Sequence, residues 1–219
     1  MKTDMELRRD VQAGLDWDPR FDARDIGIGV KDGVVTLTGK VSSYAERNAA
    51  EEATQAVAGV RAIANEIGIE LHEAAKRDDT ELAAAALSSL RSHVSVPADD
   101  IKVIVRDGWI TLEGEVALRF QADVAEKAVQ NLWGVKGVIN NIRMRTPPLT
   151  TISDVKAKIE DAFRRHAQLD ADTIRISLDD GTLILSGEVH SLRERNDAEA
   201  AAWAAPGITQ VENRIHVQL

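Results

Sequence analysis

Acid–base or metal chemistry in this 219-residue chain would rest on histidine and acidic side chains, since the sequence contains no cysteine. Without cysteine there is no thiol nucleophile, no disulfide and no cysteine-ligated zinc. A metal-binding helix presents two histidines four residues apart, and no two histidines of this chain have that spacing. We therefore predict no metal and no cofactor, and solvent-exposed histidines: His72, His93, His166, His190 and His216.

An aspartate precedes a glycine at three equivalent places, Asp32, Asp107 and Asp180. A recurring carboxylate could serve as an acid or base, but Asp-Gly is also the strongest short signal for a β-hairpin turn. The sequence contains no Gly-x-Ser-x-Gly motif and no phosphate-binding loop. Gly27-Ile28-Gly29 is similar to part of the dinucleotide-binding glycine motif, but that motif begins a helix and these residues lie inside a predicted strand. We predict that the aspartates are turn residues and that the chain is not an enzyme.

One glycine motif resembles a nucleic-acid clamp. Gly134-Val135-Lys136-Gly137 matches the GXXG loop of KH domains, but here it joins a predicted helix to a predicted strand. The chain has 27 Lys and Arg against 36 Asp and Glu, a net charge of −9, whereas nucleic-acid binders carry basic patches. We predict no nucleic-acid partner.

The Asp-Gly segment belongs to an internal repeat. Residues 32–39, 107–114 and 180–187 share the pattern Asp-Gly, alternating apolar residues and a second glycine. A further glycine and an asparagine follow at the same spacing each time. These recurring residues form the structural signature of the repeat: Gly33, Gly39, Gly59 and Asn65; Gly108, Gly114, Gly134 and Asn140; Gly181, Gly187, Gly207 and Asn213. We predict three domains: residues 1–72 (module 1), 78–146 (module 2) and 150–219 (module 3).

Each module is predicted to fold as helix–strand–strand–helix–strand. Apolar residues four apart mark the first helix, period-two alternation marks the strands, and Asp-Gly marks the hairpin. The class is α+β: three tandem αββαβ two-layer sandwiches, each a three-stranded mixed sheet with two helices on one face. The first-helix residues predicted to be buried are Leu7, Val11 and Leu15; Leu82, Ala86 and Leu90; and Val155, Ile159 and Phe163.

Capping pairs are predicted at the helix starts. Ser or Thr three residues before Glu forms a capping box, as at Thr3 with Glu6 and at Ser43 with Glu46. Asp78 with Glu81, Thr151 with Asp154, and Ser191 with Glu194 have the same spacing, whereas Leu118 and Gln121 are predicted to lack a cap.

Glycine within the second strand predicts the close approach of another backbone. The second helix of each module carries small residues, and we expect it to lie low over Gly39, Gly114 and Gly187. The stripes predicted to face the sheet are Ala50, Ala53 and Val57; Ala125, Ala128 and Leu132; and Ala198, Ala201 and Ala205. The repeated asparagines face inward in the last strand and are expected to bond loop or bulge backbone, because buried polar groups need partners.

The ordered set of these motifs resembles the BON domain, named for bacterial osmotically inducible and nodulation proteins. The resemblance covers nearly the whole chain as three copies. Module 1, with Trp17-Asp18-Pro19 and the Val-Ser-Ser-Tyr-Ala-Glu run of residues 41–46, looks like the three-module stress or "transport-associated" type. The resemblance implies a non-enzymatic bacterial module linked to envelope or osmotic stress, with phospholipid or protein as the bound partner.

Aromatic residues that only one module carries are the candidates for contacts: Trp17, Trp109, Phe120, Trp133 and Trp203. Module 2 holds three of them, and the stretch that contains it, residues 76–148, has no net charge, whereas residues 1–75 and 149–219 are acidic. One hypothesis is that its aromatics pack against the flanking modules or another subunit; the alternative is that each covers the rim of its own module. We expect a protein partner or self-association, and keep as the alternative a peripheral phospholipid-binding protein.

The beginning of the chain predicts its compartment. Residues 1–11 contain no apolar run typical of a signal peptide, and no stretch approaches the twenty apolar residues of a membrane-spanning helix. We expect a cytoplasmic protein; the alternative is a periplasmic one, as for many proteins of the family it resembles.

Overall fold

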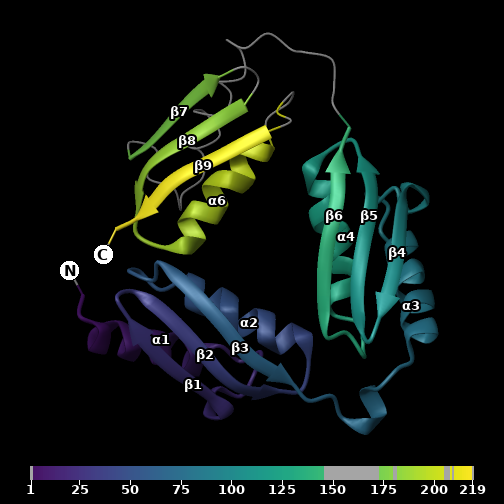
Figure 1. Cartoon of the computed structure of the whole chain (residues 1–219), viewed down its shortest axis with the longest axis horizontal. Coiled ribbons are helices and arrows are strands. Elements are labelled where there is room, and N and C mark those ends of the chain that lie inside the picture. Colours follow the sequence, from purple (N-terminus) through teal and green to yellow (C-terminus); the bar gives the residue numbers. More distant parts are fainter. Residues whose placement is uncertain (1, 146–172, 180–181, 205–207, 209, 219) are drawn as a thin grey trace. The chain divides into compact units, whose positions relative to one another are not determined.

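The computed structural model describes residues 2–145, 173–179, 182–204, 208 and 210–218. These residues build three separate three-stranded sheets, with strand orders β1-β2-β3, β4-β5-β6 and β7-β8-β9 (Figure 1). The predicted α+β class and the three mixed sheets are confirmed.

The elements follow the predicted order. Module 1 contains α1 (Asp4–Trp17), β1 (Ile26–Lys31), β2 (Val34–Val41), α2 (Tyr44–Gln55) and β3 (Ala62–Ile69). Module 2 contains α3 (Asp79–Ser92), β4 (Ile101–Arg106), β5 (Trp109–Val116), α4 (Arg119–Gln130) and β6 (Gly137–Met144). Module 3 contains β7 (Ile174–Asp179), β8 (Thr182–Val189), α6 (Leu192–Trp203) and β9 (Gln210–Val217). Short 3-10 turns cover Ala23–Asp25, Glu73–Ala75 and Ala98–Asp100.

Some predictions for module 3 lie outside the described residues. They are the first-helix stripe Val155, Ile159 and Phe163, the cap at Thr151, the turn at Asp180-Gly181, and Ala205, Gly207 and His166. The other four histidines are exposed, as predicted.

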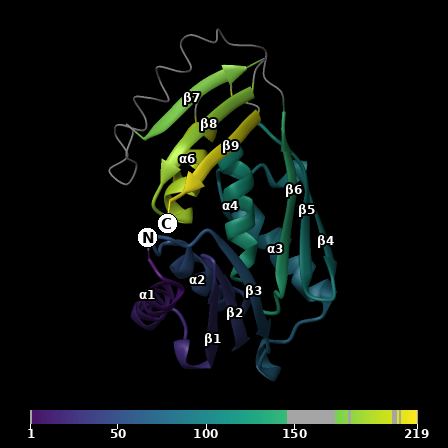
Figure 2. The same ribbon diagram turned by 60° about the vertical axis from the view of Figure 1, so that its left-hand side comes forward.

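Module 2 shows how the strands pair. β4 and β5 form an antiparallel hairpin in which Arg106 lies opposite Trp109, and β6 runs parallel to β5 from Gly137 beside Trp109. Asp107 and Gly108 both have positive φ, at 52° and 82°, as a type I′ turn requires. The helices α3 and α4 lie on one face of this sheet (Figure 2).

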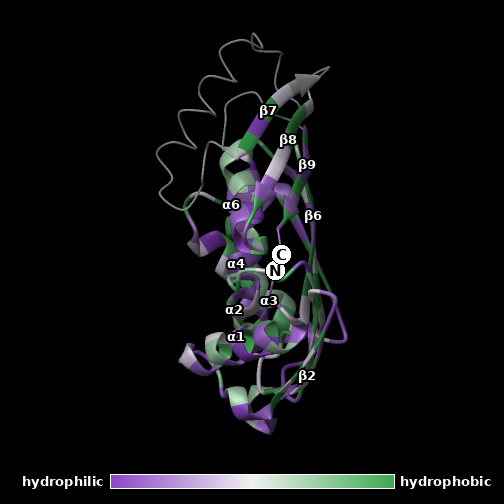
Figure 3. Cartoon of the chain, turned by 90° about the vertical axis from the view of Figure 1, so that its left-hand side faces the viewer, coloured by the Kyte–Doolittle hydropathy of each residue, from purple (hydrophilic) through white to green (hydrophobic). Residues whose placement is uncertain are grey.

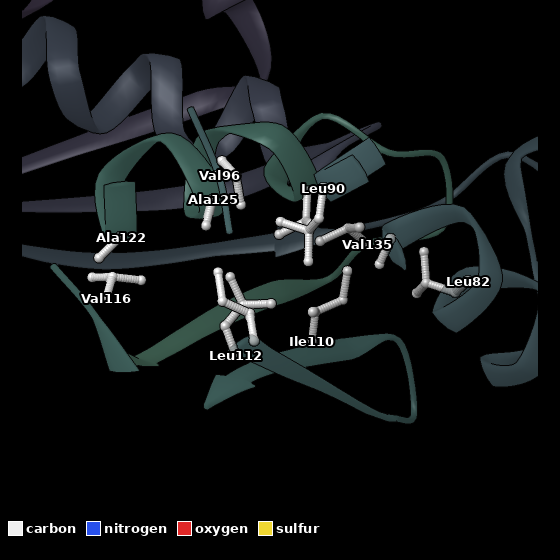
Figure 4. Packing of buried hydrophobic residues seen from close by; sticks show 12 residues of the cluster. Leu82, Leu90, Val96, Ile110, Leu112, Val116, Ala122, Ala125 and Val135 are labelled. Atoms are coloured by element: carbon white, nitrogen blue, oxygen red, sulfur yellow. The ribbon is translucent and has the colours of Figure 1, made fainter. Parts of the chain in front are cut away.

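The core of module 2 fills the space between these two layers (Figure 4). The predicted residues of α3 and β5 are buried, because their spacing of four and of two puts them on one face of each element. They are Leu82, Ala86, Leu90, Ile110, Leu112 and Val116. The opposite face of the sheet carries none of these side chains.

The inward face of the second helix agrees in part with the predicted stripe. In α4 the buried residues are Ala122, Ala125 and Val129, whereas the predicted Ala128 and Leu132 pack against the core but are only partly buried. In α2 the predicted Ala50 is buried together with Ala49 and Thr54. In α6 the predicted Ala198 and Ala201 are buried together with Ala202.

The strand glycines are needed because the backbone that precedes the paired strand lies against them, not because the second helix does. A methyl group on Gly114 would collide with the backbone carbonyl oxygen of Asp100, just before β4. Gly39 meets Asp25 and Gly187 meets Thr173 in the same way, and φ lies between +121° and +153° at all three glycines. A backbone does approach closely, as predicted, but it is the flank of the paired strand and not the second helix.

The helix starts are capped as predicted at α1 and α3, whereas α4 has a side-chain contact that was not predicted. Thr3 and Glu6 form a complete capping box, and Asp78 accepts the N–H of Glu81 at 2.8 Å. At α4, where no cap was predicted, the Gln121 side chain accepts the N–H groups of Ala117 and Leu118, each at 3.1 Å. The half of the capping box in which the side chain of the third helical residue accepts backbone N–H groups is therefore present, although no hydroxyl residue stands at the cap position.

Candidate functional site

The aromatic residues singled out from the sequence do not form one cluster. Trp17, Trp109, Phe120 and Trp133 are exposed by 88%, 43%, 49% and 65%. Within module 2, Trp109 lies at the hairpin end of the sheet, whereas Phe120 is in the first turn of α4. Trp203 is partly buried against the core of module 3, which favours the alternative that it covers its own module.

Trp109 has a matched partner on the neighbouring strand. It lies on the outward face of β5, and its ring covers Gly137 so closely that any larger residue there would collide with it. The other modules have Val34 and Thr182 in place of the tryptophan. The second glycine of the GXXG motif therefore accommodates an indole, and the first, Gly134 (φ +94°), lies just beyond the C-terminal end of α4.

Two isoleucines lie on the same face of the sheet as this tryptophan, the face away from the helices. Figure 3 shows the ribbon of β6 with the helices α3 and α4 to one side of it. We define the outer apolar patch as Ile104, Trp109 and Ile139, which come from β4, β5 and β6. Thr111 lies between the two isoleucines in the register. Module 1 has Gly29, Val34 and Ala64 at the patch positions, and module 3 has Ser177, Thr182 and Glu212.

Cationic side chains lie beside the patch. Arg106 is the cross-strand neighbour of Trp109, and the side chain of Lys136 lies close to Gly108 in the turn. Lys102, at the other end of β4, is 4.0 Å from Glu113. Exposed apolar surface with a charged rim is typical of a contact surface.

The hairpin turn next to the patch is held by a carboxylate that was not predicted from the sequence. Asp79 accepts the N–H of Asp107 at 2.8 Å and the N–H of Gly108 at 3.0 Å. Asp4 does the same for the turn of module 1. An aspartate directly after the helix cap in both modules was the available signal.

The repeated asparagines clamp the last strand to the second helix. The Asn140 side chain accepts the N–H of Ile142 at 3.1 Å and donates to Glu126 at 3.0 Å and to the Ala122 carbonyl at 3.1 Å. The asparagine–glutamate contact recurs from Asn65 to Glu51 and from Asn213 to Glu199. The asparagines bond backbone groups, as predicted, but these groups belong to the strand itself and to the second helix and not to a loop or bulge. The glutamate partner was not predicted, although it precedes each asparagine by the same fourteen residues.

Surface ion pairs lower the pKa of several carboxyl groups, among them Asp18 and Asp22 of module 1. Hydrogen bonds from Arg24 lower the pKa of Asp22 to about 2, and hydrogen bonds from Arg20 lower the pKa of Asp18. Both ion pairs lie in the segment that joins α1 to β1. In the described part of the chain, no group of three or more histidine and acidic side chains is placed to hold a metal ion, and no helix is long and apolar enough to cross a bilayer.

Comparison with known proteins places the architecture in a family. The chain is 27% identical over 146 residues to Osmotically-inducible protein Y of Escherichia coli (strain K12), which covers 65% of this chain and 73% of the relative. Two structures of CdsD, a structural protein of the Chlamydia trachomatis type III secretion system, align at 13% and 14% identity. The alignments cover 100% and 94% of this chain, and 100% and 90% of those chains. Their TM-scores are 0.27 and 0.25.

The BON domain model matches three times, at residues 3–70, 78–146 and 151–218. These matches span almost the entire sequence, so the chain belongs to the BON domain family.

Proposed function

We propose that the chain is a non-catalytic binding or scaffold protein of the bacterial stress response, acting through protein–protein contacts. One contrast carries the proposal. The residues that all modules share are occupied in building the fold, whereas the pairing of the exposed Trp109 with the buried Gly137 beneath its ring occurs in module 2 alone. The similarity to an osmotically inducible protein supports the link to stress.

The outer apolar patch is the proposed contact surface. Tryptophan is enriched at the energetic centres of protein interfaces because it buries a large rigid area. Trp109 and Ile139 are each more than 40% exposed, so a partner would remove substantial apolar surface from water. The partner can be another protein, a second copy or a flanking module.

The contact role of Trp109 can be tested by replacing each tryptophan with the residue that another module has at the same position. Trp109→Thr installs the residue that module 3 has at this position, and Trp203→Gln installs the residue of modules 1 and 2. Cross-linking in osmotically stressed cells should give adducts with the wild type and Trp203→Gln that Trp109→Thr loses. Equal adducts from all three chains would contradict the proposal.

Packing of aromatics between modules or subunits is a separate part of the proposal. If Trp109 and Trp133 serve it, Trp109→Ala and Trp133→Ala should change the sedimentation coefficient or lower the unfolding midpoint. If both variants leave the two quantities unchanged, this packing is excluded.

Peripheral phospholipid binding is the second candidate function, favoured by the cations beside the indole. Arg106 and Lys136 lie at the same sheet end as Trp109, and an amphipathic aromatic with basic neighbours suits an anionic lipid interface. In sedimentation with anionic vesicles at low salt, the wild-type chain should pellet and an Arg106→Glu variant should stay in the supernatant. If the wild-type chain does not pellet, phospholipid binding is excluded.

The compartment is a separate question with two alternatives, cytoplasmic and periplasmic. Fractionation of cells that express a carboxy-terminally tagged chain tests them.

A further inference from the structure

The two edges of the module 2 sheet differ in how their backbone groups are occupied. At the β6 edge, the N–H of Arg145 donates to the Val116 carbonyl at 2.8 Å, so odd-numbered residues of β6 direct their N–H toward β5. The N–H of Ile142 therefore faces the free edge, where the Asn140 side chain accepts it. This edge is closed at its centre by its own side chain.

The β4 edge remains open. In a two-residue hairpin the residues beside the turn exchange hydrogen bonds and bonded pairs then alternate, so Lys102, Ile104 and Arg106 bond to β5. The valines Val103 and Val105 direct their N–H and carbonyl groups away from β5, whereas the N–H of Ile101, at the start of the strand, donates to the Ala98 carbonyl. No described strand pairs with that side of β4.

The composition of β4 suits the addition of another strand. Four of its six residues are β-branched, and it contains no glycine, proline or acidic residue, whereas β1 contains two glycines and β7 ends in Asp179. Lys102 and Arg106 project from its outward face on either side of Ile104. Arg106 has no ion-pair partner within the described residues.

We propose that the β4 edge of module 2 binds an extended peptide segment of a partner protein as a fourth, antiparallel strand. The segment carries acidic side chains at the first and fifth of five residues, opposite Arg106 and Lys102, and an apolar residue at the third, opposite Ile104. Backbone hydrogen bonds to the open edge provide affinity, and the alternate side chains provide specificity. The inference rests on the protein-binding role proposed above and names the class of partner.

A lone strand fits this edge better than a second copy of the sheet. Helix α3 packs against β4. Paired strands are only about 4.8 Å apart, whereas packed helices need about 8–10 Å between their axes. A second module 2 pairing through its own β4 would drive the two α3 helices together, but a peptide without a helix meets no such obstacle.

Amide hydrogen exchange of the full chain tests the strand directly. The capped peptide Glu-Val-Ile-Val-Glu should slow exchange at Val103 and Val105, and should bind at least about tenfold more tightly than Lys-Val-Ile-Val-Lys. The double variant Lys102→Glu and Arg106→Glu should reverse this preference. Failure of the acidic peptide to bind, or equal binding of both peptides, overturns the proposal.

Proline at the edge separates strand pairing from simple charge attraction. Val103→Pro removes an N–H that faces the open edge and leaves the bonds to β5 in place, so it should abolish peptide binding. Ile28→Pro, the equivalent change in β1, should leave binding unchanged. Unaltered exchange at Leu112 confirms that the Val103→Pro sheet is intact, and peptide binding that survives this change overturns the proposal.

Two further outcomes distinguish the sources of failure. Displacement of the acidic peptide by anionic vesicles would assign the β4 cations to a membrane surface and overturn the peptide proposal. Lack of peptide binding by a chain whose cross-linked adducts still depend on Trp109 would reject the β4 edge while keeping the binding role.

Discussion

Replacing Asn140 with alanine tests the clamp between β6 and α4. The change removes three hydrogen bonds of 3.0–3.1 Å, one of them to the Glu126 carboxylate, and leaves the edge N–H of Ile142 without its acceptor. Neutral hydrogen bonds contribute about 1 kcal/mol each and a charged one about 1.5–3 kcal/mol. Since Asn140 and Glu126 are only partly buried, water replaces part of the loss, and we expect about 2–3 kcal/mol.

Native-state hydrogen exchange resolves this loss module by module, which is necessary because three domains need not unfold as one unit. The free energy of opening at Leu112, in the module 2 core, should fall by the expected amount. The equivalent amides, Leu37 and Leu185, should not change. Asn141→Ala, on the exposed side of the same strand, is the matched control; an equal effect of the two substitutions would refute the clamp.

Asn140→Asp adds an electrostatic test of the same contact. The new carboxylate keeps the acceptor for Ile142 but faces Glu126, so its pKa should be raised in the folded state. A raised carboxyl pKa destabilises the native state at neutral pH, and stability recovers as the pH falls below that pKa. Adding Glu126→Gln should restore most of the loss at pH 7. No recovery with either change would show that the two side chains do not interact.

Three further predictions concern other contacts. Gly114→Ala should lower the free energy of unfolding of module 2 by at least about 2 kcal/mol, because the added methyl group would collide with the Asp100 backbone at a positive φ. A smaller loss, measured by hydrogen exchange, would show that the Asp100 backbone does not restrict this position. Asp79→Ala should lower stability by about 1–2 kcal/mol and speed amide exchange at Asp107, and unchanged exchange there would exclude the turn clamp. Arg24→Ala should raise the pKa of Asp22 from about 2 toward 3.8; the wild-type ion pair stabilises the fold above pH 3.8 and is lost as the pH falls through about 2, which carboxyl NMR titration would show.

The sequence by itself determined the repeat, the α+β class, and the inward faces of the strands and of the first helices of modules 1 and 2. These features depend on local rules: residues four apart share a helix face, residues two apart share a sheet face, and Asp-Gly supplies two positive φ values. Each signal was present three times, so chance matches could be recognised by their failure to recur, as with the GXXG motif of module 2.

Only the tertiary structure decided which groups meet between elements. Glu126 and Asn140 are fourteen residues apart, and their contact depends on how α4 is rotated over β6. The packing of α4 also decided which residues of the predicted helix stripe are fully buried: Ala125 is, whereas Ala128 and Leu132 are partly buried. Trp109 reaches Gly137 because the parallel register of β5 and β6 places them side by side. Such contacts depend on packing and strand register, which the chain acquires when its layers assemble and which no local pattern encodes.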